Sequence, residues 1–264
     1  MANNWKHFSS WDTVLPPNRP GRAETDLLRT CLLNANKDLA IVMGATPEYR
    51  NLLKLLGFKA IVVIEKNISF LNSLSHLSIE SEVETIVEGD WLDVLQEYRG
   101  KCDVIISDTT LGNIPFEKQD FLQTSMCETL QPDGILFDRI VHYRDGLCNW
   151  ELINETFRFL PVNLETANLF HIMAVFRSPT IAEIGRVNAK SAYDAVIGQN
   201  PKLLRIAELT KLWVTPEMCE WYYDGKYRHP FKNYEHFLSS LNEINFDLSG
   251  FGRNISIVIG KKQE

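Results

Sequence analysis

The chain has 264 residues, of which 45% are apolar and 23% charged, and this ordinary globular balance excludes a largely disordered or fibrous protein. Acidic residues outnumber Lys and Arg by 34 to 27, and a net charge of −7 argues against binding to nucleic acid, which needs a cationic surface. No apolar run reaches the roughly 20 residues of a membrane span, and residues 1–7 lack the blocks of a signal peptide. We expect a cytoplasmic protein without membrane contact.

The five cysteines lie far apart and form no C-x-x-C pair. A structural zinc site normally uses two close pairs of ligands, so we expect no metal site and interpret the cysteines as small buried side chains. An odd number of scattered cysteines also indicates a reducing compartment. They are Cys31, Cys102, Cys127, Cys148 and Cys219.

Short apolar runs alternate with helical patterns between residues 39 and 143. The runs predict strands at 39–43, 60–64, 83–87, 103–107 and 135–143, and the intervening patterns predict helices at 47–56, 68–77, 92–98 and 121–130. Pro132-Asp133-Gly134 is typical of a turn before the last of these strands. Continuous apolar strands separated by helices predict a doubly wound, Rossmann-like α/β fold with a mostly parallel sheet. Its ligand should lie beyond the carboxyl ends of the strands.

The following segment, residues 144–232, differs in pattern. Helical stripes run over 149–160, 164–176, 179–197 and 201–213, although 168–176 also suits a strand. Phe237, Leu238 and Leu241 suggest a closing helix, and residues 246–251 and 254–261 suggest two final strands that rejoin the sheet. The predicted layout is an N-terminal arm and helix (1–38), a cofactor-binding core (39–143), a helical insertion (144–232), and a closing helix with the final strands of the core (233–264).

The turn after the first predicted strand is Gly44-Ala45-Thr46-Pro47-Glu48. Gly44 permits a tight turn where a side chain would obstruct a ligand, and Thr46, Pro47 and Glu48 suit the start of a helix. The amides of such a helix start can hold a carboxylate or phosphate. A plain helix start explains the turn equally well, since the same tripeptide recurs at Thr215-Pro216-Glu217 with no other sign of a ligand.

Two acidic residues follow the next two strands. Glu65 lies 21 positions after Gly44 (65 − 44), close to the offset of about 20 at which an acid reaches ribose hydroxyls. Asp90 precedes Trp91, and an acid beside a large flat ring suits an adenine base. The alternatives are that Glu65 is an exposed loop acid and that Asp90 caps a helix with Trp91 in the core; capping and adenine binding are compatible.

The fourth predicted strand leads into a polar segment, Asp108 to Ile114. It lies where a doubly wound sheet opens, so its side chains could contact both a cofactor and a substrate.

These ordered motifs resemble the class I S-adenosylmethionine-dependent methyltransferases over about residues 39–143 and the closing strands. Gly44 to Glu48 is similar to the family's first motif, in a subgroup with G-x-T-P-E there, although Ala45 and Thr46 stand where further glycines are common. Glu65 resembles the ribose-binding acid, and Asp90 the adenine-binding acid. Residues 130–136 resemble the L-x-P-G-G-x-L turn, with Asp133 in place of the first glycine.

The resemblance implies S-adenosyl-L-methionine as cofactor and a class I methyltransferase type of sheet. In similar proteins the N-terminal arm often closes over the cofactor, which would bring Arg19 to a carboxylate; an arm packed across the sheet edge is the alternative. The implied cofactor-binding residues are Arg19, Gly44, Ala45, Thr46, Pro47, Glu65, Lys66, Asp90, Trp91, Asp108 and Thr109.

Methyl transfer needs a base only when the acceptor is protonated, and positioning supplies much of the catalysis. The candidate bases are Asp108, His142, Tyr143 and His229. An aromatic and basic segment, Trp221 to His229, offers Tyr222, Tyr223 and Arg228 as acceptor contacts, or else packs the insertion's own core. Residues 177–232 carry nine Lys and Arg against six acids, which hints at an anionic acceptor or reflects an ordinary solvated surface.

The sequence thus predicts methyl transfer to a small-molecule or peptide acceptor and leaves the oligomeric state open. One alternative is a methyltransferase-like module that binds without catalysis. The other is an NAD(P)-dependent oxidoreductase, against which the missing G-x-G-x-x-G and the amide lost at Pro47 both argue.

Overall fold

The computed structural model describes most of the first 141 residues and parts of the remainder. The described residues are Trp11, 19–114, 118–141, 157–163, 166, 202, 205, 240–247 and 253–262, with only the backbone at 140–141, 240–247 and 253–256. The chain divides into two compact units. One consists of Met1–Asn18, Val141–Phe231 and Asn245–Ile255, and the other of Arg19–Ile140, Lys232–Ile244 and Ser256–Glu264. The second unit carries most of the sheet and the helices that cover it.

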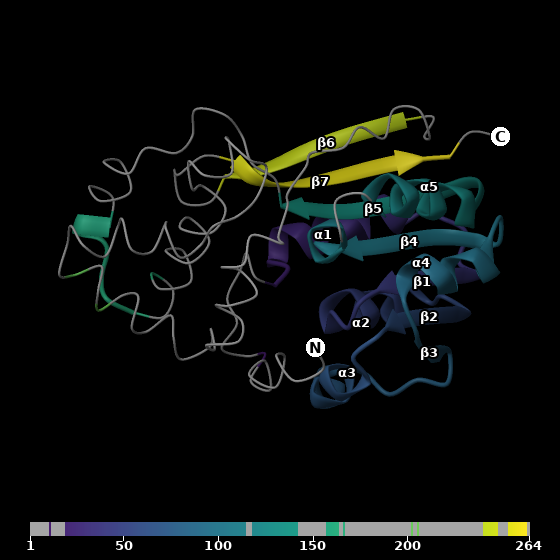
Figure 1. The fold of residues 1–264 in the computed structure, drawn as a ribbon, viewed down its shortest axis with the longest axis horizontal. Helices are drawn as coiled ribbons and strands as arrows, with labels where there is room; N and C mark the ends of the chain where they lie inside the picture. The colour runs from purple at the N-terminus through teal and green to yellow at the C-terminus, as the bar shows by residue number, and fades with distance from the viewer. Residues whose placement is uncertain are drawn as a thin grey trace. The chain divides into compact units, whose positions relative to one another are not determined.

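Within the described ranges, seven strands form one sheet in the order β3-β2-β1-β4-β5-β7-β6 (Figure 1). The strands are β1 (Leu39–Met43), β2 (Ala60–Glu65), β3 (Glu84–Glu88), β4 (Cys102–Asp108), β5 (Leu130–Val141), β6 (Ser240–Asp247) and β7 (Arg253–Lys261). The strands from β3 to β5 pair in parallel. β7 runs against β5, because Lys262 exchanges backbone hydrogen bonds with Asp133 and Gly134 near the start of β5. The dinucleotide-binding order 3-2-1-4-5-6 therefore does not apply, since β7 separates β5 from β6.

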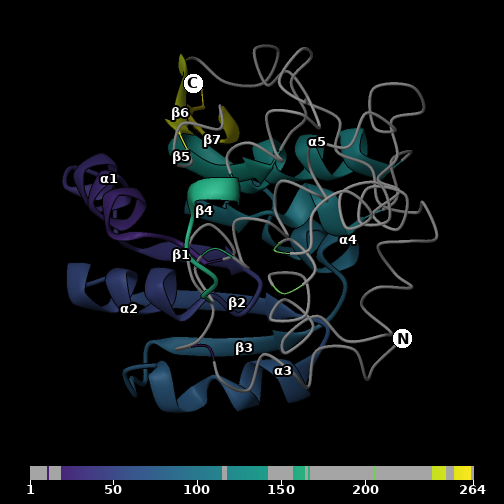
Figure 2. The same ribbon diagram turned by 90° about the vertical axis from the view of Figure 1, so that its left-hand side faces the viewer.

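Helices cover both faces of the sheet. They are α1 (Arg22–Leu32), α2 (Pro47–Leu56), α3 (Ile68–Ser73), α4 (Trp91–Val94) and α5 (Gln119–Thr129), with 3-10 turns η3 (Ser75–Leu77), η4 (Leu95–Tyr98) and η5 (Thr110–Asn113). In Figure 2, α1 and α2 lie on one side of the sheet, and α4 and α5 lie on the other. This arrangement confirms the doubly wound, Rossmann-like α/β fold.

The central strands are buried because their side chains are apolar on both faces. Ile41, Met43 and Ile105 point into a cluster with Leu122 and Met126 of α5. The alternate residues of the same strands, such as Val42 and Ile106, are equally buried on the opposite face. A sheet covered on both sides needs this continuous hydrophobicity, which the sequence pattern indicated.

Two sequence expectations are wrong. The first is the turn expected at Pro132–Gly134, because these residues are part of β5. The register of β5 against β4 is irregular near Cys102, and Asp133 has a positive φ of 65°. The second is the closing helix expected to include Leu241, because Leu241 lies in β6. A short apolar pattern of this kind fits both a helix and a strand, and pairing within the sheet decides between them. Phe237 and Leu238 lie outside the described residues.

None of the helices in the described part of the chain combines the length and the hydropathy that a membrane crossing requires. Nearly all of the predicted insertion, 144–232, also falls outside the described residues.

Candidate functional site at the carboxyl edge of the sheet

Four predicted site residues follow four neighbouring parallel strands. Gly44 comes directly after β1, Asp90 comes two residues after β3, and Glu65 and Asp108 end β2 and β4. Because β3, β2, β1 and β4 are adjacent and parallel, their carboxyl ends lie along one edge of the sheet. The structure therefore brings these four positions to the edge where a ligand of this fold binds.

The turn from β1 to α2 depends on the backbone of Gly44. Its φ is +105°, in the region that side chains rarely adopt, and its amide donates to the Ile64 carbonyl at 3.0 Å. A Cβ at Gly44 would meet no heavy atom within 4 Å, so backbone conformation rather than crowding calls for glycine here. Ala45 and Thr46 are buried, and Pro47 begins α2.

Thr46 does not cap α2 with its side chain. Its hydroxyl instead donates to Oδ2 of Asp108 at 2.8 Å and ties the turn to the end of β4. Helix α2 therefore has no side-chain N-cap, and the positive end of its dipole lies at the carboxyl edge.

Glu65 is half-buried at the end of β2. Its Oε1 accepts a hydrogen bond from the Asn67 amide at 2.7 Å. Burial raises the pKa of this carboxyl, against the effect of the Asn67 and Lys66 amides. Groups that donate hydrogen bonds to Glu65, as the hydroxyls of a diol would, favour its ionised form.

Asp90 caps α4, which is the alternative that the sequence analysis gave for this residue. Its Oδ1 accepts from the Leu92 amide at 3.0 Å, and its Oδ2 accepts from the exposed ammonium of Lys66 at 3.1 Å. Burial opposes ionisation, but these two partners lower the pKa of Asp90 overall. Trp91 packs against the core, and its indole N–H donates to the Ile64 carbonyl at 2.9 Å.

Asp108 belongs to a buried chain of charges. The guanidinium of Arg139 donates to Oδ1 of Asp108 at 2.9 Å and to Oε1 of Glu24, in α1, at 2.7 Å. The side chain of Arg139 is 1% exposed. Both oxygens of Asp108 thus accept hydrogen bonds, one from the Thr46 hydroxyl and the other in the ion pair with Arg139. The adjacent Thr109 has a φ of 56°, and its amide donates to the Arg139 carbonyl at 2.7 Å.

Sequence reasoning missed Glu24 and Arg139. The available signal was the pair Asp138-Arg139, two charges inside an otherwise apolar strand, and both side chains are almost fully buried. The contact of Arg19 with a cofactor carboxylate stays a prediction; in the structure Nε of Arg19 lies 3.2 Å from Oε1 of Glu48, in the first turn of α2.

Several buried polar atoms near the same edge have no hydrogen-bond partner in the described part of the chain. They belong to residues at the end of β4, in η5 and at the start of α5, namely Ser107 Oγ, Thr110 Oγ1, Gln119 Oε1 and Gln123 Nε2. Buried groups of this kind usually bind ordered water or a ligand. Thr110 belongs to the polar segment that the sequence analysis singled out, whereas Gln119 and Gln123 were not singled out.

The remaining predicted site residues lie outside the described residues. They are His142, Tyr143, Tyr222, Tyr223, Arg228 and His229. The acceptor site is therefore untested, and so is the closure of residues 144–232 over it.

Among the described residues, no group of three His, Cys, Asp or Glu side chains could hold a metal ion. Burial raises the pKa of the Cys102 and Cys127 thiols to about 12, so both stay protonated at neutral pH. These two cysteines are buried small side chains, as the sequence indicated.

No family model matches the chain, and no curated protein matches it in sequence. By structure, 788 solved chains match, so the fold is a common one. A Rhodobacter sphaeroides protein, provisionally assigned to the Zn-dependent alcohol dehydrogenases, is 16% identical with a TM-score of 0.57, and the alignment covers 99% of this chain and 98% of that one.

Two matched structures from Burkholderia thailandensis are methyltransferases. An O-methyltransferase family protein is 9% identical with a TM-score of 0.49, and the alignment covers 91% of this chain but only 56% of that one. A 1,6-didemethyltoxoflavin-N1-methyltransferase, solved with its substrate and S-adenosylhomocysteine, is 10% identical with a TM-score of 0.46, covering 92% and 78%. At such identities the likeness concerns the fold alone.

Proposed function

We propose that the carboxyl edge of the sheet binds S-adenosyl-L-methionine and that the protein transfers its methyl group to a small-molecule or peptide acceptor. The observation that carries the proposal is the alignment of Gly44, Glu65, Asp90 and Asp108 after four adjacent parallel strands. Each of these residue types suits a different part of this cofactor.

The residues at this edge fit the cofactor. The half-buried Glu65 would accept hydrogen bonds from the ribose diol, which offsets the cost of burying its charge. Asp90 keeps acceptor capacity beside its two partners, and its side chain is 35% exposed, so an adenine amine can still reach it. The start of α2, without a side-chain cap, suits the carboxylate of the amino-acid portion.

When bound, the cofactor supplies an electrophilic methyl group on a sulfonium. The protein's part is then to hold the acceptor in line with that methyl group and to exclude water. Both oxygens of Asp108 are engaged by Thr46 and Arg139, so Asp108 would position the turn after β1. For an acceptor that must lose a proton, the candidate bases are His142, Tyr143 and His229.

Titration calorimetry with S-adenosylmethionine and S-adenosylhomocysteine tests the cofactor site. Glu65→Ala should weaken both by about 1–3 kcal/mol, the cost of losing charge-assisted hydrogen bonds. The control is Glu97→Ala, which removes an exposed carboxylate from η4. Since η4 precedes the start of β4 and the candidate site follows its end, both affinities should stay unchanged. Unchanged affinity in a folded Glu65→Ala variant would remove the ribose assignment.

An NAD(P)-dependent oxidoreductase is the second candidate, since the fold is shared with a protein provisionally assigned to the Zn-dependent alcohol dehydrogenases. The site argues against it, because the turn after β1 has one glycine and Pro47 removes an amide where a pyrophosphate would bind. Titration with NADH in the same calorimeter separates the two cofactors. Release of S-adenosylhomocysteine over a panel of acceptors then separates an enzyme from a module that only binds.

A further inference from the structure

Among the strands of the described residues, β3 lies at the end of the sheet and has β2 as its one neighbour. The bonds at its two ends fix which backbone groups face that neighbour. Ile61 donates to the Val83 carbonyl at 2.8 Å, and Gly89 donates to the Glu65 carbonyl at 3.3 Å. In a parallel ladder alternate residues pair, so Thr85 and Val87 also face β2. The amides and carbonyls of Ile86 and Glu88 therefore point away from the sheet.

The open side of β3 is exposed. Ile86, an apolar residue in the middle of the strand, is 44% exposed, whereas the residues of β1 and β4 are nearly all buried. Proteins usually protect an edge strand with lysine, proline, a bulge or a covering segment, because unpaired backbone groups invite another strand. β3 contains neither lysine nor proline, and its pairing with β2 is regular.

A groove of about 300 Å³ lies beside this strand. Ile86 and Glu84 line one side, and Leu71, Ser75 and Ile79 from α3, η3 and the following loop line another. An open strand next to a helix-lined groove is the geometry in which an extended peptide adds to a sheet, with its alternate side chains in the groove.

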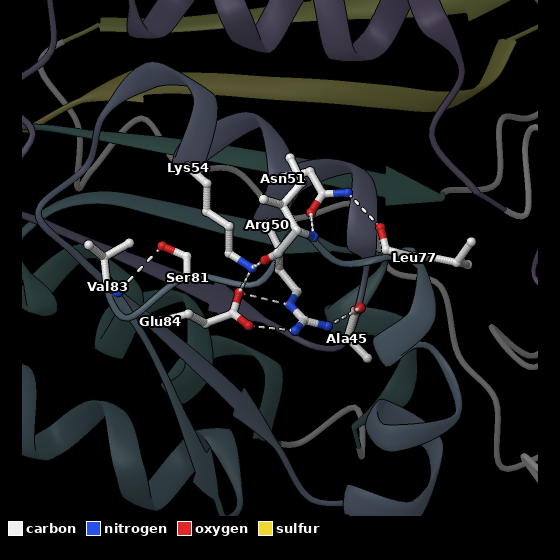
Figure 3. Close-up of polar contacts among 9 residues, drawn as sticks. Ala45, Arg50, Asn51, Lys54, Leu77, Ser81, Val83 and Glu84 are labelled. Atoms are coloured by element: carbon white, nitrogen blue, oxygen red, sulfur yellow. Dashed lines mark hydrogen bonds and ion pairs between the residues drawn. The ribbon is translucent and has the colours of Figure 1, made fainter.

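A buried ion cluster makes the wall of the groove rigid (Figure 3). Glu84 accepts from the guanidinium of Arg50 at 2.6 and 3.1 Å and from Lys54 at 2.9 Å, and all three side chains are at most 9% exposed. Asn51 fixes the opposite side by hydrogen bonds to the Leu77 carbonyl and the Ile79 amide. An extended ligand would meet a preformed surface.

The exposed charge at this edge is negative. Residues 67–98 contain seven acids and no Lys or Arg. Arg50 and Lys54 neutralise Glu84, whereas Glu80, Glu82 and Glu88 are exposed. A second copy of β3 would place like charges against each other, which is unfavourable, while a cationic partner would be attracted.

We propose that β3 and the adjacent groove bind an extended segment of a partner protein in which basic and apolar residues alternate. The segment adds as a strand to the backbone of Ile86 and Glu88. Its apolar side chains enter the groove with Leu71 and Ile79. Its basic side chains lie on the opposite face of the added strand and are attracted by the overall negative charge of this edge. This inference is independent of the cofactor and of any catalysis.

Fluorescence anisotropy with the labelled peptides (Lys-Val)4 and (Glu-Val)4 tests the proposal. The basic peptide should bind at least tenfold more tightly than the acidic one. Ile86→Pro removes an outward amide without removing a bond to β2 and should weaken binding at least tenfold. Ile86→Thr keeps the amide and should weaken it less than threefold. An equal loss in both Ile86 variants, or equal binding of the two peptides, would overturn strand addition by a basic segment.

Two further measurements keep the test sharp if Ile86→Pro lowers the melting temperature. A (Lys-Val)4 peptide methylated on alternate backbone amides should lose binding to the unmodified protein. The double change Glu82→Lys and Glu88→Lys should weaken the basic peptide more than tenfold, and Glu97→Lys less than threefold. Retained binding in either case contradicts the proposal. So does a dimer in sedimentation that Ile86→Pro dissociates, because the strand would then pair with its own copy.

Discussion

The guanidinium of Arg139 lies between two carboxylates in the interior of the fold. Burial opposes its charge, but Asp108 and Glu24 raise the pKa of Arg139 overall. Removing one partner of a buried ion pair leaves uncompensated charge, so Arg139→Met should lower the free energy of unfolding by about 3–5 kcal/mol. Arg99 pairs with Glu128 at the surface, and Arg99→Met should cost less than about 1 kcal/mol.

Urea unfolding of the two arginine variants measures this contrast directly. Similar small losses would show that Glu24 and Asp108 find other partners or take up protons at little cost. Restoration of stability on adding Glu24→Gln to Arg139→Met would support uncompensated charge as the cause.

Tyr49 has a fully buried hydroxyl with no hydrogen-bond partner among the described residues. Burial, and next to it the charge of Asp108, raise the pKa of Tyr49 well above its ordinary value. Its ring meets Phe137 edge to face, with the ring centroids 5.8 Å apart. Tyr49→Phe keeps this contact and removes an unsatisfied group, so the melting temperature should stay or rise.

The control for Tyr49→Phe is Phe137→Leu, which removes the ring contact and should lower the melting temperature. A loss of more than about 1 kcal/mol in Tyr49→Phe would mean that a buried water satisfies the hydroxyl.

At the scale of elements, Glu84 connects β3 to α2. Burial opposes its ionisation, but hydrogen bonds and charge from Arg50 and Lys54 lower its pKa overall. In acid the unfolded chain therefore binds more protons than the folded protein at this position. The stability that Glu84 contributes is present above the ordinary glutamate pKa of about 4.3 and is lost as the pH falls through the lower folded value.

Urea unfolding between pH 7 and pH 3 should therefore show a flatter acid limb for Glu84→Gln than for the unchanged protein, with lower stability at pH 7. Glu65→Gln is the control with opposite sign. Burial raises the pKa of Glu65, so its protonation favours the folded state as the pH falls, and removing it should steepen the acid limb. Parallel curves for both variants would contradict these assignments.

Sequence patterns predicted the limits of helices and strands correctly where a glycine or proline marks the end of the element. β1 and α2 match their predicted limits because Gly44, Pro47 and Gly57 mark the boundaries, and Gly57 ends α2 at a φ of 81°. The predicted helix over 68–77 instead ends at Ser73 and continues as η3. No glycine or proline occurs in residues 68–77, so no boundary residue indicates a break within that helix.

At the scale of the whole molecule, sequence reasoning located positions at the carboxyl edge but missed the contacts between them. Glu65, Asp90 and Asp108 were found because each follows a strand at a meaningful spacing. The ion pair between Glu24 and Arg139 joins residues 115 positions apart, and no local pattern reports such a pairing. The contacts of Asp108 with Thr46 and Arg139 were therefore not foreseen, and its role as a base stays a prediction.

The acceptor prediction also belongs to this scale, since it depends on residues 144–232. Tyr222→Ala, Tyr223→Ala and His229→Ala should each depress turnover while S-adenosylmethionine affinity stays within about threefold, less than ~1 kcal/mol. If these side chains pack the insertion's own core, melting temperature falls and activity declines only in proportion. Measuring both on the same three proteins separates the outcomes, and full activity in all three would remove the pocket assignment.

The position of β7 has a consequence for biosynthesis. β7 lies beside β5 in the sheet, yet β5 ends at Val141 and β7 begins at Arg253, a separation of 112 positions (253 − 141). During translation the paired edge of β5 stays open until residue 261 has left the ribosome. A nascent chain that stalls earlier presents this edge to other chains, so truncation before Arg253 should produce aggregation rather than a smaller stable domain.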